Sequence, residues 1–93
     1  MKKQLIDELY DVIISIDNKK DCEAFFADLC TYKELDQMAQ RVYAAKLLLE
    51  GKTYSQVIAE TDISSATLSR VSKCVQYGTG YTAVLGKKDK NSK

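Results

Sequence analysis

The segment YSQVIAETDISSATLSRV, residues 54–71, decides the fold of this chain. It holds a short apolar run with helical spacing, a break at Asp62 and Ile63, and a second run that opens with serines. The pattern predicts two short helices joined by a tight turn. The first begins at residue 53 or 54 and ends near residue 61, and the second runs from the N-cap Ser64 to about residue 76.

The predicted turn has residues suited to a close corner between the two helices. Asp62 is expected in the left-handed conformation, which Asp and Asn tolerate better than most residues. Ile63 is expected to plug the corner, and the small Ala59 to let the helices cross closely. The residues expected to face inward are Tyr54, Val57 and Ile58 in the first helix, and Leu68, Val71 and Val75 in the second.

Three longer helices are predicted before this segment, over about 3–16, 19–30 and 32–50, because apolar residues recur there at intervals of three and four. The sequence TYKE, residues 31–34, is a capping box for the third helix, and Gly51 stands in the C′ position after it. The apolar stripe expected along the third helix is Leu35, Met38, Ala39, Val42, Ala45, Leu48 and Leu49.

The composition fits one small, all-α domain. The chain has 93 residues and no proline, and no strand-like alternation persists for long. Hydrophobic residues make up 45% of it, so part of the apolar surface is expected to be buried against a second copy. Three of the four glycines fall in the last sixteen residues. We therefore expect a helical domain over 1–77 and a flexible Gly/Lys-rich loop and tail over 78–93.

The net charge of +1 hides an uneven distribution. Residues 1–64 carry eight Lys and Arg against twelve Asp and Glu, whereas residues 65–93 carry six against one. A basic region that begins with the second short helix is typical of nucleic-acid binding. Lys87–Lys93 supplies four of these positive charges, so a solubilising tail is the alternative explanation for that part.

Several functional classes fit the sequence poorly. The chain has no histidine and no C-x-x-C pair, which disfavours a metal site and removes the usual general base of an enzyme. YGTGY, residues 77–81, lacks the spacing of a phosphate-binding loop. No apolar run approaches the roughly 20 residues that span a bilayer. Three cysteines without an evident targeting signal suggest reduced thiols in the cytoplasm.

Two short helices joined by a tight turn describe the DNA-binding helix-turn-helix, whose second helix enters the major groove. Serines and an alanine give that helix a slender start. Arg70 and Lys73, one turn further on, can reach phosphates or a guanine edge. The candidate DNA-binding residues are Ser55, Gln56, Ser64, Ser65, Ala66, Ser69, Arg70 and Lys73.

The chain also resembles the Trp repressor superfamily, in particular its YerC/YecD-type members. The resemblance lies in CTYKELDQMAQRVYAAKLLLEG (30–51) and SATLSR (65–70), and it covers about 1–76. It implies an intertwined all-helical homodimer whose two recognition helices enter successive major grooves of an operator, repressing transcription. By position, the resemblance makes Ser65, Ala66 and Ser69 the residues that face the bases.

The resemblance further implies an effector pocket between Arg41 and Arg70, whose guanidinium planes can sandwich an indole. The candidate pocket residues are Thr31, Arg41, Ala45, Thr67, Arg70, Val71 and Cys74. Two of them differ from the tryptophan-binding members. Val71 replaces a glycine and fills space that the indole would need. Cys74 replaces a serine that helps to hold the amino group of the ligand, and a thiol is a poor hydrogen-bonding partner.

We therefore predict no cofactor, and L-tryptophan is kept only as an alternative corepressor. A protein–protein adaptor that uses the same helix-turn-helix surface is the other alternative. For Arg41, the alternative role is an arginine whose stem lies along the surface and whose head pairs with a carboxylate such as Asp36.

Overall fold

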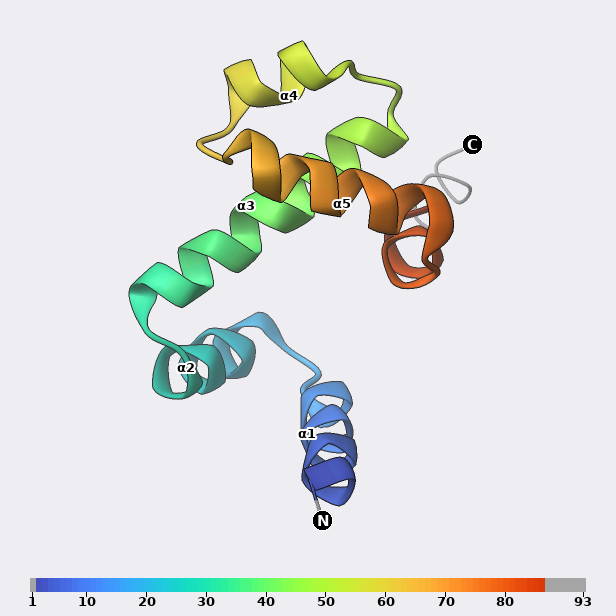
Figure 1. Ribbon diagram of the computed structural model, residues 1–93. Helices are drawn as coiled ribbons and strands as arrows, with labels where there is room; N and C mark the ends of the chain where they lie inside the picture. The colour runs from blue at the N-terminus through green and yellow to red at the C-terminus, as the bar shows by residue number, and fades with distance from the viewer. Residues whose placement is uncertain (1, 87–93) are drawn as a thin grey trace. The chain divides into compact units, whose positions relative to one another are not determined.

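The structure of the chain, a computed structural model, describes residues 2–86 and is helical throughout (Figure 1). The helices are α1 (Lys2–Ser15), α2 (Lys19–Leu29), α3 (Tyr32–Leu49), α4 (Tyr54–Glu60), α5 (Ser65–Tyr77) and η1 (Thr82–Gly86). No strand occurs within residues 2–86, so the predicted all-α class is confirmed. None of the helices described is long and apolar enough to cross a membrane. The chain divides after Leu35 into two compact units.

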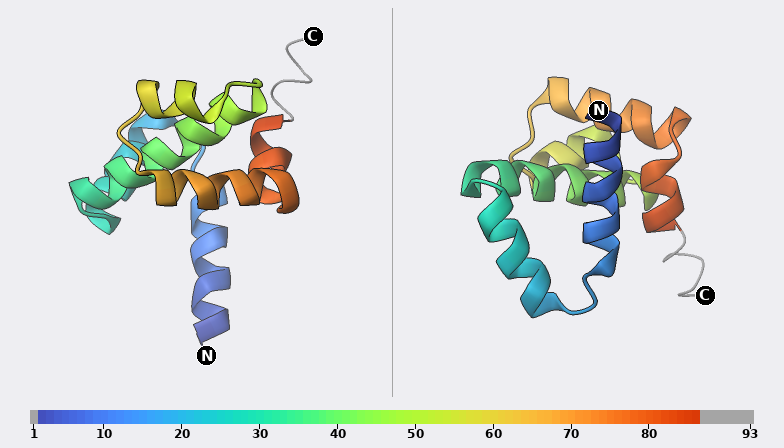
Figure 2. Two further views of the ribbon diagram at one scale, coloured as in Figure 1. Left: turned by 45° about the horizontal axis from the view of Figure 1, so that its top comes forward. Right: turned by 90° about the horizontal axis from the view of Figure 1, so that it is seen from below.

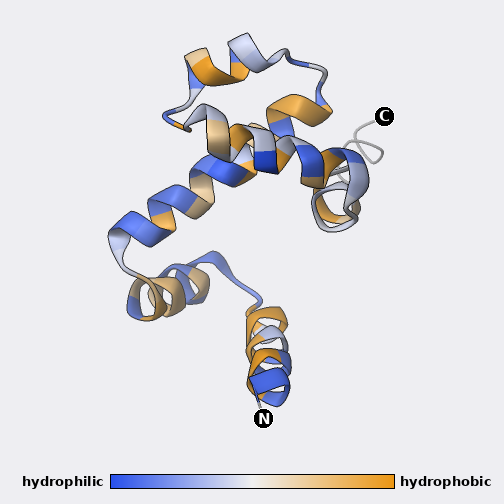
Figure 3. Cartoon of the chain, in the orientation of Figure 1, coloured by the Kyte–Doolittle hydropathy of each residue, from blue (hydrophilic) through white to orange (hydrophobic). Residues whose placement is uncertain are grey.

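The first unit contains α1 and α2, which form where the sequence predicts them. Asn18 caps α2 by accepting a hydrogen bond from the Asp21 amide at 2.8 Å. Neither helix has a buried residue, and Figure 3 shows apolar segments along α1. The large apolar side chains that α1 exposes are Leu5, Ile6, Leu9, Tyr10, Val12 and Ile14. An open hollow of about 630 Å³ runs along this helix.

The two ends of α3 are set by the local signals expected from the sequence. Thr31 Oγ1 accepts from the Glu34 amide at 3.1 Å, and a Glu34 carboxylate oxygen accepts from the Thr31 amide at 2.8 Å. The predicted capping box is therefore confirmed. At the other end Gly51 has φ +93°, its amide donates to Leu48 O, and the Lys52 amide donates to Leu47 O. This is the Schellman arrangement of a C′ glycine.

The core of the second unit brings α3, α4 and α5 together, as both views in Figure 2 show. It consists of seven buried apolar residues: Ala44, Ala45, Leu47, Val57, Ile63, Leu68 and Val71. Leu68, Val57 and Val71 are the largest side chains that are fully covered. The burial predicted for Val57, Ile63, Leu68 and Val71 is confirmed.

The apolar stripe predicted along α3 is partly wrong. Ala45 of the predicted stripe is buried, whereas Ala39 is exposed and Val42 is 44% exposed. Ala44 and Leu47, which the predicted stripe does not include, are buried as well. The physical reason is that α3 carries apolar residues on two sides. One side, at Ala44 and Leu47, packs in the core of the same chain. The other side, at Met38, Val42 and Leu49, stays partly or largely uncovered.

The packing predicted for α4 is also partly wrong. Tyr54 is 49% exposed and Ile58 is 40% exposed, and Ala59 is exposed rather than pressed against α5. A helix of seven residues makes only two turns, and α4 buries a single residue, Val57. Contact with the core through that one residue leaves the other side chains of α4 exposed to differing extents.

The segment after α5 contains a short helical element within the predicted loop. Gly78 is the C-cap of α5, and glycine is favoured there because a Cβ would lie 2.7 Å from the Cys74 carbonyl oxygen. Thr82–Gly86 then form a π-helical turn, and Tyr81 and Leu85 pack against the core. These two apolar residues are four apart, so one helical turn presents both on one side. The part of the predicted tail at 87–93 lies outside the described residues.

We expect Gly51→Ala to destabilise the fold by about 1–2 kcal/mol, because an L residue with a Cβ is strained at positive φ. Equilibrium urea unfolding at one fixed protein concentration would measure the change. Gly80→Ala is the matched control, since Gly80 has no positive φ and open space around its Cβ position. Equal effects of the two substitutions would contradict the role assigned to Gly51.

Candidate nucleic-acid interface

The turn between α4 and α5 differs from the predicted left-handed corner. Among residues 2–86 only Gly51 has a positive φ, so the prediction for Asp62 is wrong. Thr61, which ends α4, is extended with φ −132° and ψ 173°, and Ser64 is extended as well. The extended residues Thr61 and Ser64, on either side of Asp62 and Ile63, thus connect α4 to α5 without a left-handed residue.

Side-chain hydrogen bonds hold this turn instead. The Thr61 hydroxyl donates to Val57 O at 2.8 Å, and Thr61 Oγ1 accepts from the Ile63 amide at 3.3 Å. The Asp62 amide donates to Gln40 Oε1 on α3 at 3.1 Å. Ile63 is 9% exposed, which confirms that it plugs the corner.

The start of α4 is closed by a second capping box. Thr53 Oγ1 accepts from the Gln56 amide at 3.2 Å, and Gln56 Oε1 accepts from the Thr53 amide at 2.8 Å. Gln56, a candidate DNA-binding residue, therefore uses its carbonyl oxygen locally and keeps its NH₂ group free to donate elsewhere. Ser55, the other candidate on α4, is exposed.

Ser64 is the N-cap of α5, as predicted from the sequence. Its hydroxyl oxygen accepts from the Thr67 amide at 3.1 Å, and the hydroxyl donates to Thr67 Oγ1 at 3.0 Å. The Ser65 and Ala66 amides, in the first turn, have no helical carbonyl four residues earlier to bond to. Both residues are exposed, so the positive end of the helix dipole faces outward.

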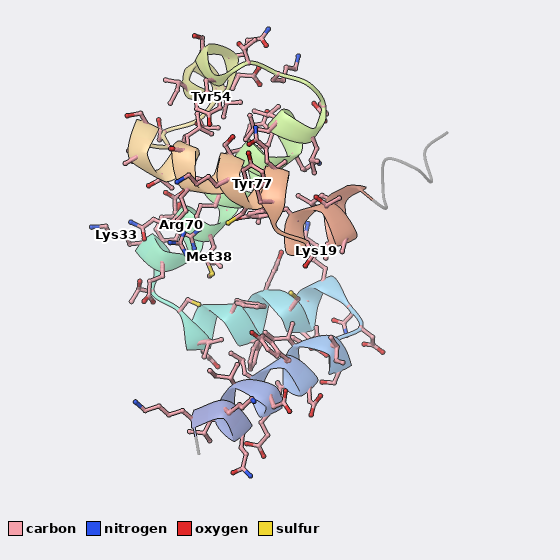
Figure 4. All side chains as sticks on the ribbon, turned by 45° about the vertical axis from the view of Figure 1, so that its right-hand side comes forward. Lys19, Lys33, Met38, Tyr54, Arg70 and Tyr77 are labelled. Carbon is pink, nitrogen blue, oxygen red and sulfur yellow. The ribbon has the colours of Figure 1, made fainter. Side chains whose placement is uncertain are left out.

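The remaining candidates on α5 are exposed, and one of them, Arg70, is labelled in Figure 4. The exposed candidates are Ser65, Ala66, Ser69, Arg70 and Lys73. Separations of three and four residues place them on one side of the helix. Leu68, Val71 and Ser72 occupy the opposite side and are buried. The structure therefore brings together the predicted residues of α5 on one accessible strip.

The charge around this strip is uniform within α5 and η1. Residues 65–86 contain Arg70 and Lys73 and no Asp or Glu. The nearest acids along the chain precede the helix, at Glu60 and Asp62. Glu60 accepts a hydrogen bond from the Tyr43 hydroxyl at 3.2 Å, and this bond, together with the negative charge of Glu60, raises the pKa of Tyr43.

The candidate effector residues do not share one environment. Ala45 and Val71 are buried in the core, at 0% and 1% exposure, so their side chains have almost no accessible surface. Arg41 and Thr67 are half-buried, whereas Arg70 and Cys74 are exposed. Thr31 belongs to the first unit, where its side chain caps α3. A separate hollow of about 340 Å³ is lined by Cys74, Gly78, Gly80 and Tyr81.

Sequence reasoning missed the residues of α3 that hold the helix-turn-helix. Gln40 bonds the Asp62 amide across 22 positions of sequence, and Tyr43 bonds Glu60 across 17. No local pattern signals such distant partners. Among residues 2–86 there is also no cluster of three or more His, Cys, Asp or Glu side chains that could hold a metal ion.

Comparisons with known proteins show the family and the fold of the chain. The family model described as Trp repressor protein matches residues 4–89, which extends past the expected limit near residue 76. The uncharacterized protein YerC of Bacillus subtilis (strain 168) is 44% identical over 73 residues, which are 78% of this chain and 70% of that protein.

Two solved structures resemble the chain with a TM-score of 0.86 each. One is a Trp repressor candidate from Staphylococcus aureus, 38% identical, with 92% of this chain and 87% of that chain covered. The other is a TrpR like protein from Eubacterium eligens ATCC 27750, 34% identical, with 92% of this chain and 90% of that chain covered.

Proposed function

Because the chain belongs to the Trp repressor protein family, we propose that it is a sequence-specific DNA-binding regulator that represses transcription. In this proposal α5 is the recognition helix, and its N-terminal end enters the major groove of an operator. The observation that carries the proposal is the exposed, acid-free strip at Ser65, Ala66, Ser69, Arg70 and Lys73.

The shape and polarity of α5 suit a major groove. The groove is roughly 12 Å wide and 8.5 Å deep, so it admits a helix whose leading side chains are small. The residues at the start of the strip are two serines and an alanine. Serine hydroxyls both donate and accept, and can therefore bond to base edges. The outward-facing helix dipole adds attraction for phosphate.

The proposal gives the residues different roles. Ser65, Ala66 and Ser69 contact base edges and thereby set sequence preference. Arg70 and Lys73 neutralise phosphates, which supplies affinity without sequence information. At the start of α4, the Ser55 hydroxyl and the Gln56 NH₂ group donate hydrogen bonds to the DNA backbone. Ser64 contributes indirectly, by capping the first turn of α5. No corepressor is part of the proposal, because Ala45 and Val71 are already covered.

We also propose that the chain acts as a homodimer. The side of α3 at Met38, Val42 and Leu49 is apolar and incompletely covered within one chain. In the first unit, α1 and α2 have no buried residue despite their apolar side chains. A second copy would cover both surfaces and would supply the second recognition helix that a two-fold operator requires.

Arg70→Ala and Lys73→Ala should each weaken duplex binding severalfold. Each should also reduce the magnitude of the slope of log affinity against log salt by about 1.8, because the dimer loses one phosphate contact in each subunit. Fluorescence anisotropy with a labelled duplex over a salt series would measure both quantities. Lys46→Ala is the matched control, since Lys46 is an exposed lysine on α3. Salt-independent binding, or no binding at all, would favour the protein adaptor instead.

Ser69→Ala should change which base is preferred at one position of each operator half-site, by roughly fivefold or more, about 1 kcal/mol. Non-specific affinity should stay nearly constant, because Ser69 carries no charge. Selection from random duplexes by the purified protein and by the variant would give the two preferences. Ser15→Ala on α1 serves as control. The role of Ser69 is contradicted if both proteins select the same sequence with the same stringency.

The wild-type chain should have about twice its 10.5 kDa monomer mass in light scattering after size exclusion. Val42→Asp should shift the mass toward the monomer, because a carboxylate buried at an apolar interface is costly. Ile58→Asp is the matched control, since Ile58 on α4 is 40% exposed and Val42 is 44% exposed. A wild-type monomer at tens of micromolar would argue against the dimer.

A further inference from the structure

The turn that leads into α5 lacks the feature that usually fixes such a corner. None of its residues adopts a positive φ, a conformation that Asp and Gly often supply in tight turns. Besides the N-cap bonds of Ser64 within α5, its local bonds run from the Thr61 hydroxyl to Val57 O and from the Ile63 amide to Thr61 Oγ1. Both bonds lie on the α4 side, so they leave the direction of α5 relative to α3 to other contacts.

Two side chains of α3 provide those contacts. Gln40 Oε1 accepts from the Asp62 amide at 3.1 Å, and the Tyr43 hydroxyl donates to Glu60 at 3.2 Å. One bond holds the turn and the other holds the end of α4. Gln40 is followed four and seven residues later by Ala44 and Leu47, which lie in the core. The same side of α3 thus contacts the helix-turn-helix in two ways. Ala44 and Leu47 pack in the core, and Gln40 and Tyr43 make hydrogen bonds.

We infer that Gln40 is a positioning residue for the recognition helix. By fixing the Asp62 amide on α3, Gln40 sets the direction in which α5 leaves the turn. The inference rests on the proposed DNA binding by α5. It deepens that proposal by naming a residue that would determine sequence preference without touching DNA.

The physical argument is the different tolerance of the two kinds of DNA contact. Hydrogen bonds to base edges require donor–acceptor distances near 2.7–3.2 Å and near-linear geometry, so they are lost after small tilts of α5. Attraction between Arg70 or Lys73 and phosphates falls only as the inverse of distance, so small tilts change it little. Loss of the Gln40 bond should therefore lower the specific affinity and leave the non-specific affinity almost unchanged.

A purely structural role for Gln40 would lower the stability of the fold when the bond is lost, and the surroundings of the bond argue against that result. The bond joins groups in exposed surroundings, where water can replace the lost acceptor. The core at Leu68 and Val71 is untouched by a change at Gln40. The variant should consequently stay folded, and thermal unfolding should show a transition close to that of the wild type.

The test compares three variants of the full chain. Gln40→Met keeps the length of the side chain and removes the acceptor oxygen, whereas Gln40→Glu keeps an acceptor for the Asp62 amide. Gln37→Met is the matched control, one turn earlier on α3 and exposed. Amide hydrogen exchange by NMR reports the bond at Asp62. Anisotropy with the duplex selected by the wild type and with a scrambled duplex reports the ratio of specific to non-specific affinity.

Gln40→Met should speed exchange of the Asp62 amide about tenfold and lower the affinity ratio about five- to tenfold, with scrambled-duplex affinity within twofold of wild type. Gln40→Glu should restore slow exchange and most of the ratio. Gln37→Met should change neither quantity. A ratio in Gln40→Met that equals the wild-type ratio, despite fast exchange at Asp62, overturns the positioning role and leaves the proposed function standing. A wild-type ratio near one overturns both, since no specificity then exists to be positioned.

Discussion

The packing of one side of α5 against α3 and α4 is the constraint on which the rest of the structure depends. Leu68, Val57 and Val71 are fully covered, and burying side chains of this size contributes roughly 1.5–3 kcal/mol each. Because α5 has one buried side, its rotation about its own axis is fixed. That rotation turns Ser69, Arg70 and Lys73 outward. The polar strip is therefore a consequence of the apolar Leu68 and Val71 standing on the opposite side of the same helix.

Local bonds and distant bonds divide the work of shaping the helix-turn-helix. The caps at Thr53 and Ser64 set where each helix begins, and they use only residues three positions away. Neither cap sets the angle between the helices. The angle depends on the core and on the bonds that Gln40 and Tyr43 make from α3. Helix α3 thus contributes side chains to the core and also makes the hydrogen bonds that position α4 and the turn.

This division explains how much the sequence could predict. Helix limits, the capping box at Thr31 and the glycine end at Gly51 follow from neighbouring residues, and the structure confirms them. Asp62 was misjudged because its partner is 22 residues away, and no local rule weighs a distant acceptor against a left-handed turn. Ala39 and Val42 were misjudged because helical spacing identifies apolar sides but does not say what covers each one. The candidate strip on α5 was predictable since it required only one strongly amphipathic helix.

The second apolar side of α3 then acquires a physical meaning. A small domain buries a modest share of its surface, and an exposed apolar side would normally be selected against unless something covers it. Here 45% of the residues are hydrophobic, yet within residues 2–86 the buried core contains seven of them. Val42 is 44% exposed on the same helix that buries Ala44 completely. Covering that side with a second copy would stiffen α3 from behind, and a stiffer α3 would hold Gln40 and the turn more firmly. In the proposed dimer, subunit association and the orientation of α5 would therefore be coupled through α3.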